Sequence, residues 1–152
     1  MSKFVYVSYI RTDIYKLWKA LLEPEFTKQY WFGVVQECNW KAGSPWKMIL
    51  PDGRVADAGE VLEIDPPRKL VLKWQNQFMP ELTAEGYSRA TIELETQENG
   101  TVKLSINHEI DVENSKLITA VSGGWPKIIS NLKSLLETGQ TFGPIAKVPG
   151  KT

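Results

Sequence analysis

The chain has 152 residues, of which 42% are hydrophobic and 24% charged, as is usual for one soluble globular domain with a sizeable core. Eighteen basic residues balance eighteen acidic ones, which excludes a global field that would attract nucleic acid or an anionic membrane surface. The single cysteine excludes an intrachain disulfide. The N-terminus lacks a signal-peptide layout, and no apolar run reaches membrane-spanning length. Together with the single cysteine, these features predict a cytoplasmic protein without membrane insertion.

The N-terminal part predicts a strand followed by two short helices. Residues 4–10 alternate and are rich in aromatic and β-branched side chains, as in a strand. Thr12 is the predicted cap of a first helix, with Asp13 in its first turn. Glu23 and Pro24 begin a second helix that ends near residues 30–33. We expect the two helices to bracket one edge of the sheet.

The middle of the chain predicts six further antiparallel strands separated by turns. The predicted strands are residues 34–40, 45–50, 55–64, 69–75, 87–95 and 101–110. Asp52-Gly53 and Asn99-Gly100 are hairpin signals. Alternation directs the following residues toward the core: Trp46, Met48, Leu50, Leu70, Leu72, Trp74, Ser88, Ala90, Ile92, Leu94, Val102, Leu104, Ile106, His108 and Ile110. For residues 34–40 and 55–64 the inward face is ambiguous.

The C-terminal part predicts one long amphipathic helix, from about residue 125 to 138. Its apolar stripe consists of Trp125, Ile128, Ile129, Leu132, Leu135 and Leu136. Asn131 lies on the opposite face, which we expect to be solvated. Pro126 suits the first turn, Gly139 suits the end, and Gly123-Gly124 should separate this helix from a short helical turn after Asn114.

These elements predict an α+β helix-grip fold: a curved antiparallel sheet of six or seven strands around a long C-terminal helix. Two short helices follow the first strand. We expect residues 1–139 to form a single domain and residues 140–152 to form a loosely held tail.

Several short motifs, in their order and spacing, resemble one known family across residues 4–139. They are Pro24-Glu25, Tyr30-Trp31, Asp52-Gly53, Gly59 to Leu70 leading to Trp74, His108, and Gly124-Trp125 leading to Glu137. The chain resembles the START-like or Bet v 1-like (SRPBCC) superfamily, and within it bacterial proteins similar to the C-terminal domain of the Hsp90 ATPase activator. The resemblance implies a hydrophobic cavity between the helix and the sheet. Members of the superfamily bind lipids, sterols, polyketides or plant metabolites, and a few are cyclases.

Six tryptophans in a small domain indicate an aromatic core or an aromatic-lined pocket. The predicted ligand-binding residues are Trp31, Trp46, Met48, Trp74, Ser88, His108, Trp125 and Ile129. His108, the only histidine, is either a polar anchor or general base for a ligand, or a buried neutral imidazole bonded to a backbone carbonyl. The rings could equally fill the space between helix and sheet.

Other parts of the chain indicate less specific roles. Phe78, Met79 and Leu82 are apolar residues in the loop 75–86, which could form a lid, a docking patch or a segment folded onto its own core. Four acidic residues of one hairpin arm are expected to be solvated: Asp57, Glu60, Glu63 and Asp65. One cysteine and one histidine provide no metal spacing, and no glycine-rich phosphate loop precedes a helix, so we expect neither metal nor cofactor.

Three functions are compatible with this sequence. The first is binding of a small hydrophobic or aromatic ligand, such as a lipid, a polyketide or a similar metabolite, without catalysis. The second is a cyclase or hydrolase that uses His108 in the same cavity. The third is a chaperone-associated protein-interaction module. A homodimer is compatible with all three.

Overall fold

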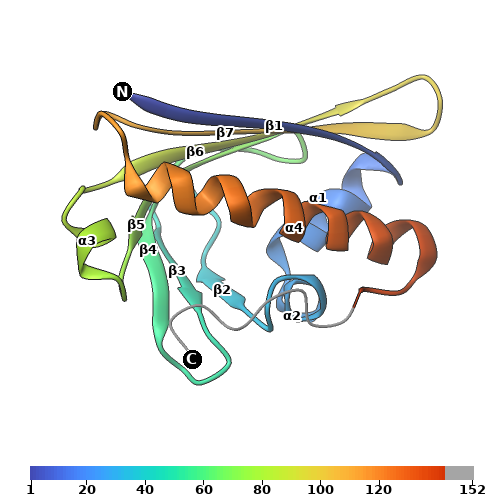
Figure 1. Cartoon of the computed structure of the whole chain (residues 1–152). Helices are drawn as coiled ribbons and strands as arrows, with labels where there is room; N and C mark the ends of the chain where they lie inside the picture. Colours follow the sequence, from blue (N-terminus) through green and yellow to red (C-terminus); the bar gives the residue numbers. More distant parts are fainter. Residues whose placement is uncertain (143–152) are drawn as a thin grey trace.

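The computed structural model describes residues 1–142 and shows a seven-stranded antiparallel sheet that curves around one long helix (Figure 1). The strands are β1 (Ser2–Arg11), β2 (Val35–Cys38), β3 (Pro45–Ile49), β4 (Val55–Asp65), β5 (Lys69–Asn76), β6 (Ser88–Thr96) and β7 (Thr101–Ile110). The helices are α1 (Ile14–Leu22), α2 (Pro24–Tyr30), α3 (Pro80–Thr83) and α4 (Lys116–Thr138). The α+β helix-grip fold is therefore confirmed. The short helix α3, inside the predicted loop, was missed.

The strand order β1-β7-β6-β5-β4-β3-β2 places β1 and β2 at opposite edges of the sheet. Helices α1 and α2 therefore connect the two edges, and the expectation that they bracket a single edge is wrong (Figure 1). The reason is the long-range pairing of β1 with β7, in which Ser2 lies opposite Ile110. Nothing in the local sequence of residues 1–33 reveals that partner.

Helix α1 begins one residue later than predicted. Its N-cap is Asp13, whose side chain accepts a hydrogen bond from the backbone N–H of Lys16 at 2.8 Å. The predicted cap Thr12 makes no side-chain hydrogen bond among the described residues. A carboxylate at the cap satisfies an N–H group that has no partner inside the helix and also suits the positive end of the helix dipole.

Helix α4 is 23 residues long and runs without a break through Gly123-Gly124 and Pro126 (Figure 1). The predicted separation at the glycines and the placement of Pro126 in a first turn are therefore wrong. The added N-terminal part buries Leu117 and Ile118 in a cluster with Leu82 of α3. Burial of these side chains outweighs the helix cost of two glycines, about 1 kcal/mol each.

The start of α4 is capped by two side chains. Ser115 accepts a hydrogen bond from the N–H of Ile118 at 3.1 Å. Glu85, in the loop after α3, accepts from the N–H of Lys116 at 2.8 Å and from the hydroxyl of Ser115 at 2.6 Å. A carboxylate here satisfies free N–H groups and lies at the positive end of the helix dipole.

We expect Glu85→Gln to lower the unfolding free energy by about 1 kcal/mol, because the neutral amide keeps one acceptor oxygen but loses its attraction to the helix dipole. Urea unfolding followed by circular dichroism measures the change. Glu81→Gln, at an exposed position of α3, is the matched control and should differ from the wild type by less than about 0.5 kcal/mol. Equal effects of the two substitutions would contradict the assignment of Glu85 as the cap.

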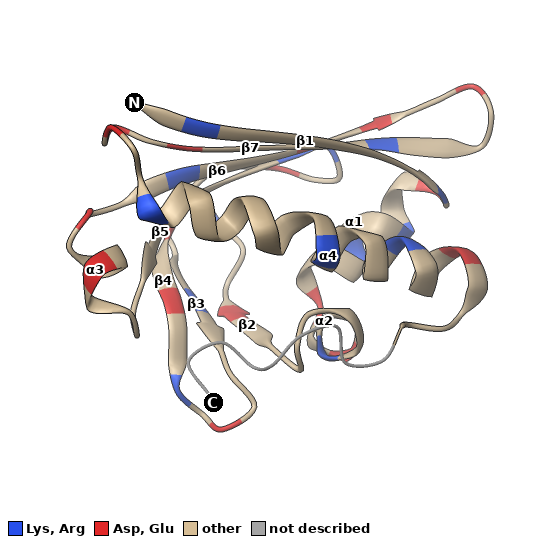
Figure 2. Ribbon diagram, viewed as in Figure 1, with Lys and Arg blue, Asp and Glu red and all other residues tan. Residues whose placement is uncertain are grey.

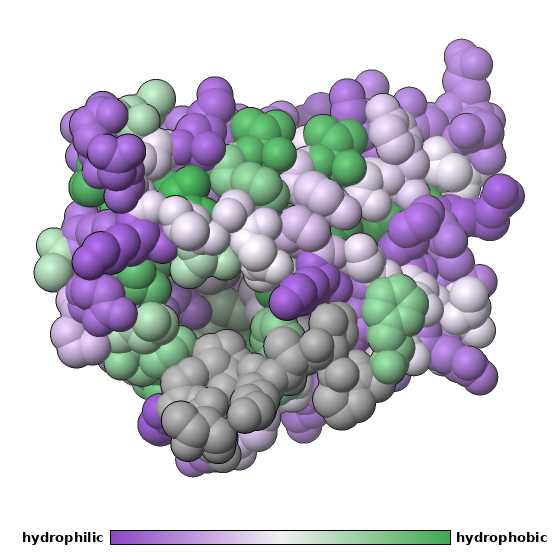
Figure 3. Space-filling model, viewed as in Figure 1, coloured by the Kyte–Doolittle hydropathy of each residue, from purple (hydrophilic) through white to green (hydrophobic). Residues whose placement is uncertain are grey.

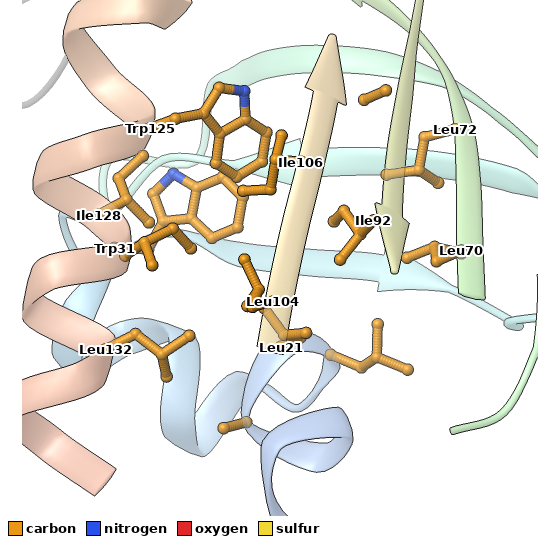
Figure 4. Close-up of a cluster of buried hydrophobic side chains, with 14 of the residues drawn as sticks. Leu21, Trp31, Leu70, Leu72, Ile92, Leu104, Ile106, Trp125, Ile128 and Leu132 are labelled. Carbon is orange, nitrogen blue, oxygen red and sulfur yellow. The ribbon is translucent and has the colours of Figure 1, made fainter. Parts of the chain in front are cut away.

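The core lies between α4 and the concave face of the sheet. Figure 4 shows Trp125, Ile128 and Leu132 pointing from α4 toward Leu104 and Ile106 of β7. All fifteen inward residues predicted from strand alternation are buried. On α4 the prediction fails for Asn131, which is buried because its amide donates to the carbonyl of Tyr30 and accepts from the N–H of Phe142.

The surface carries acidic and basic residues interspersed over helices and strands (Figure 2). No helix within residues 1–142 is both long enough and apolar enough to span a membrane. The predicted tail, residues 140–152, falls mostly outside the described residues. Its first part folds back on α4, where the hydroxyl of Ser134 donates to the carbonyl of Gln140 at 2.7 Å.

Candidate functional site

A cavity of about 430 Å³ lies between the N-terminal half of α4 and strands β3, β4 and β5. The space-filling view shows the surface hollowed below α4 (Figure 3). The lining is mostly apolar and includes Trp31, Phe32, Val34, Met48, Leu50, Ala56, Trp74, Phe78, Met79, Leu82, Leu117, Ala120, Val121, Trp125 and Ile128. Its size and composition are typical of pockets for small molecules.

Three indole rings form one wall of the cavity. The ring of Trp125 lies 5.4 Å from that of Trp31 and 5.8 Å from that of Trp74, measured between centroids. These rings come from α4, from the end of α2 and from β5, and their tilted or edge-on contacts fix one another. Behind them the C-terminal half of α4 packs on a filled core that contains Ile129 and Leu132. The space between helix and sheet is thus hollow at one end and filled at the other.

Small residues on α4 leave the cavity open. Gly123 and Gly124 both line it, and a Cβ atom added at either position would meet no atom within 4 Å. The glycine pair therefore contributes no side chain to this part of the lining.

The structure divides the eight predicted ligand-binding residues into two sets. Four of them line the cavity: Trp31, Met48, Trp74 and Trp125. The other four are buried outside the lining: Trp46, Ser88, His108 and Ile129. Trp46 packs against Trp74 at a tilt, with 4.7 Å between ring centroids, and donates its indole N–H to Gln36. It supports the wall from behind.

His108 is held between two side chains. The Nε1–H of Trp125 donates to Nδ1 of His108 at 3.1 Å. Because Nδ1 is an acceptor, the neutral imidazole carries its proton on Nε2, which donates to the hydroxyl of Ser88 at 2.8 Å. Ser88 in turn donates to the backbone carbonyl of Trp74 at 3.0 Å. The chain of donors and acceptors is complete.

This network keeps His108 neutral. Burial lowers the pKa of His108 from 6.5 to about 4, because the charged form is poorly solvated. Protonation of Nδ1 would also place an N–H donor against the indole N–H of Trp125, and the hydrogen bond between them would be lost. The expected contact with a backbone carbonyl is instead made through Ser88. His108 orients Trp125, and through it the aromatic wall.

Asp57 was predicted to be solvated, and that prediction is wrong. It lines the cavity, and its Oδ1 accepts the indole N–H of Trp74 at 2.9 Å. Burial raises its pKa from 3.8 to about 7, although the hydrogen bond from Trp74 acts in the opposite direction. The three residues that the prediction grouped with it behave as expected, since at the surface Glu60 pairs with Lys73, Glu63 with Lys69 and Asp65 with Arg68.

A β-bulge explains why the sequence gave no signal for Asp57. Met48 lies opposite Asp57, whereas the next residue, Ile49, lies opposite Val55, so Ala56 is an extra residue on β4. Ala56 and Asp57 both line the cavity as a result. Strict alternation cannot place consecutive residues on one face.

Asn76 organises the loop that closes one side of the cavity. Its Oδ1 accepts hydrogen bonds from the N–H of Phe78 at 3.1 Å and of Met79 at 2.8 Å. The hydroxyl of Thr83 donates to the backbone carbonyl of Asn76 at 2.7 Å. Phe78, Met79 and Leu82 all line the cavity, so the apolar residues of this loop form one of its walls.

Charged side chains are few around the cavity. Among the described residues its lining contains only Asp57 and Lys127, and Lys127 is exposed on α4. His, Cys, Asp and Glu side chains of residues 1–142 do not gather in groups of three that could hold a metal ion. The site can hold an apolar molecule and offer it a few hydrogen-bonding groups.

Residues 11–137 match the family described as Activator of Hsp90 ATPase homolog 1-like protein. Curated proteins give no match. A protein from Mesorhizobium loti is 22% identical with a TM-score of 0.75, over 90% of this chain and 97% of that one. The Aha1 dimer from Colwellia psychrerythraea is 18% identical with a TM-score of 0.71, over 91% and 98%. DynU16, from the dynemicin biosynthetic locus, is 16% identical with a TM-score of 0.70, over 91% and 48%. At these identities the likeness is one of fold.

Proposed function

The chain belongs to the family of activator of Hsp90 ATPase homolog 1-like proteins, in the START-like superfamily, and we propose that it binds a small, largely apolar ligand in the cavity under α4. The proposed unit is a single cytoplasmic domain of residues 1–139. The observation that carries the proposal is the cavity of about 430 Å³ with its indole wall and its glycine pair. A structural relative from the dynemicin biosynthetic locus is compatible with a ligand of the polyketide class.

The ligand is bound rather than converted by His108. Both nitrogens of that imidazole are occupied by Trp125 and Ser88, and the side chain is fully buried. A general base needs a free nitrogen within reach of the substrate. The contribution of His108 is to hold Trp125 in place.

The proposal is tested by titration with 8-anilinonaphthalene-1-sulfonate, whose emission rises in an apolar site. We expect saturable binding to the wild type and at least a tenfold weaker affinity for Gly124→Leu, because the leucine would occupy the cavity. Thr119→Leu, on an exposed position of the same helix outside the lining, should bind like the wild type. Equal affinities of the two variants would contradict binding at this site.

Association with a chaperone of the Hsp90 class is a second candidate, supported by the family to which the chain belongs. The relative from Colwellia psychrerythraea, an Aha1 dimer, is likewise compatible with a homodimer. Sedimentation of the purified protein alone and with an Hsp90-type chaperone tests both. A monomer that does not co-sediment with the chaperone would leave ligand binding as the proposed function.

A further inference from the structure

We propose that the cavity selects apolar ligands that carry a hydrogen-bond acceptor next to a donor, as a primary carboxamide, lactam or hydroxy ketone does. Asn76 would donate to the ligand acceptor, and Asp57 would accept from the ligand donor. This inference rests on the proposed function, because it names the chemical class that the same cavity takes.

The amide of Asn76 presents its donor to the cavity. Two backbone N–H groups, of Phe78 and Met79, fix the orientation of the side chain by binding its oxygen. The Nδ2 group must then point the other way, and it makes no hydrogen bond within residues 1–142. Asn76 is 6% exposed and lines the cavity. Its Nδ2 is not among the fully enclosed polar atoms without a partner, so it remains accessible to a ligand.

The carboxyl of Asp57 presents an acceptor in the same way. Trp74 occupies Oδ1, whereas Oδ2 has no hydrogen bond or ion pair within the described chain and is not fully enclosed. Within residues 1–142, Lys127 is the only other charged side chain of the lining, and it forms no salt bridge with Asp57. The raised pKa of Asp57 agrees with a carboxyl that lacks a partner in an apolar site.

The two groups lie side by side. Asp57 on β4 and Asn76 on β5 are directly opposite each other in the sheet, which places their Cβ atoms about 5 Å apart. Apolar side chains make up most of the remaining lining. A ligand that fills the cavity without pairing these groups would leave a donor and an acceptor desolvated, at a cost that discriminates strongly against it.

The inference is tested by calorimetry at pH 8.5 with three naphthalene probes. Naphthalene-2-carboxamide carries both an acceptor and a donor, 2-acetylnaphthalene carries the acceptor alone, and naphthalene carries neither. We expect the wild type to bind the carboxamide at least tenfold more tightly than the ketone, and the ketone more tightly than naphthalene. In Asp57→Asn, Trp74 retains an oxygen partner and an amide nitrogen replaces Oδ2. The preference for the carboxamide over the ketone should then fall to about one or reverse.

Asn76→Asp removes the donor while keeping the oxygen that holds the loop. The affinities for the carboxamide and for the ketone should both fall relative to the affinity for naphthalene. Unchanged naphthalene affinity shows in each variant that the cavity is intact. Equal affinities of the wild type for all three probes would overturn the inference while leaving the proposed function standing. Failure of every probe to bind the wild type would count against the proposed function itself.

Discussion

Gly59→Ala should lower the unfolding free energy by at least about 3 kcal/mol, beyond what overpacking of a core side chain usually costs. A Cβ atom at this position would lie 1.7 Å from the carbonyl oxygen of Lys73 and 3.2 Å from the backbone nitrogen of Trp74. Both atoms belong to β5, which is paired with β4 on one side and with β6 on the other. The clash is therefore with a central strand that cannot move by itself.

The same substitution should also disturb the aromatic wall. Gly59 lies between Trp46 on β3 and Trp74 on β5 in the register of the sheet, and the two indoles meet across it. Displacement of β5 would separate these rings, and near-ultraviolet circular dichroism would detect the change.

Gly123→Ala is the matched control for this experiment. Gly123 lies within α4, and an added Cβ meets no atom within 4 Å. Alanine has the higher helix propensity, so the variant should be more stable than the wild type by about 0.5 to 1 kcal/mol. A Gly59→Ala protein as stable as the wild type in urea unfolding would contradict the close approach of β4 and β5.

Asp57→Asn should stabilise the protein above pH 7 and lose this advantage as the pH falls to 4. The folded protein holds the proton on Asp57 up to a pKa of about 7, whereas the unfolded chain releases it near 3.8. Ionisation above pH 7 therefore costs the folded wild type up to about 4 kcal/mol, an upper limit that partial solvation of the carboxyl reduces. The neutral asparagine avoids this cost and keeps an acceptor for Trp74.

Protonation of His108 changes the stability in the opposite direction from protonation of Asp57, over nearly the same pH range. Its pKa is about 4 in the folded protein and 6.5 without burial, so its contribution to stability is complete above pH 6.5 and is lost as the pH falls toward 4. In the wild type the gain from protonating Asp57 offsets this loss. In Asp57→Asn the loss should stand alone, and stability should fall steadily from pH 6.5 to 4.

Urea unfolding of both proteins at several values between pH 4 and 8.5 measures this difference. Glu63→Gln is the control, since Glu63 is an exposed member of an ion pair on the same strand and should change stability by less than about 1 kcal/mol at every pH. Parallel pH profiles for the wild type and Asp57→Asn would show that Asp57 titrates as a solvated carboxyl.

Features that depend on neighbouring residues in the sequence, such as the buried face of a strand or the position of a turn, could be predicted. Strand alternation correctly placed His108 and Ser88 on the inner face, and the hairpin signals at residues 52–53 and 99–100 correctly separated the strands. The apolar stripe of α4 showed which side of that helix packs on the sheet. These properties follow from the periods of helices and strands, which are local.

Only the tertiary structure decided the length of α4, the position of Asp57 and the shape of the interior. Distant contacts, the cap from Glu85 and the burial of Leu117, overrode the local signals of Gly123-Gly124. A bulge opposite Met48 put Asp57 in the cavity, and bulges depend on the partner strand. Whether the space between helix and sheet is hollow depends on how side chains from five or more segments pack together. Their total volume relative to the available space cannot be read from the order of residues along the chain.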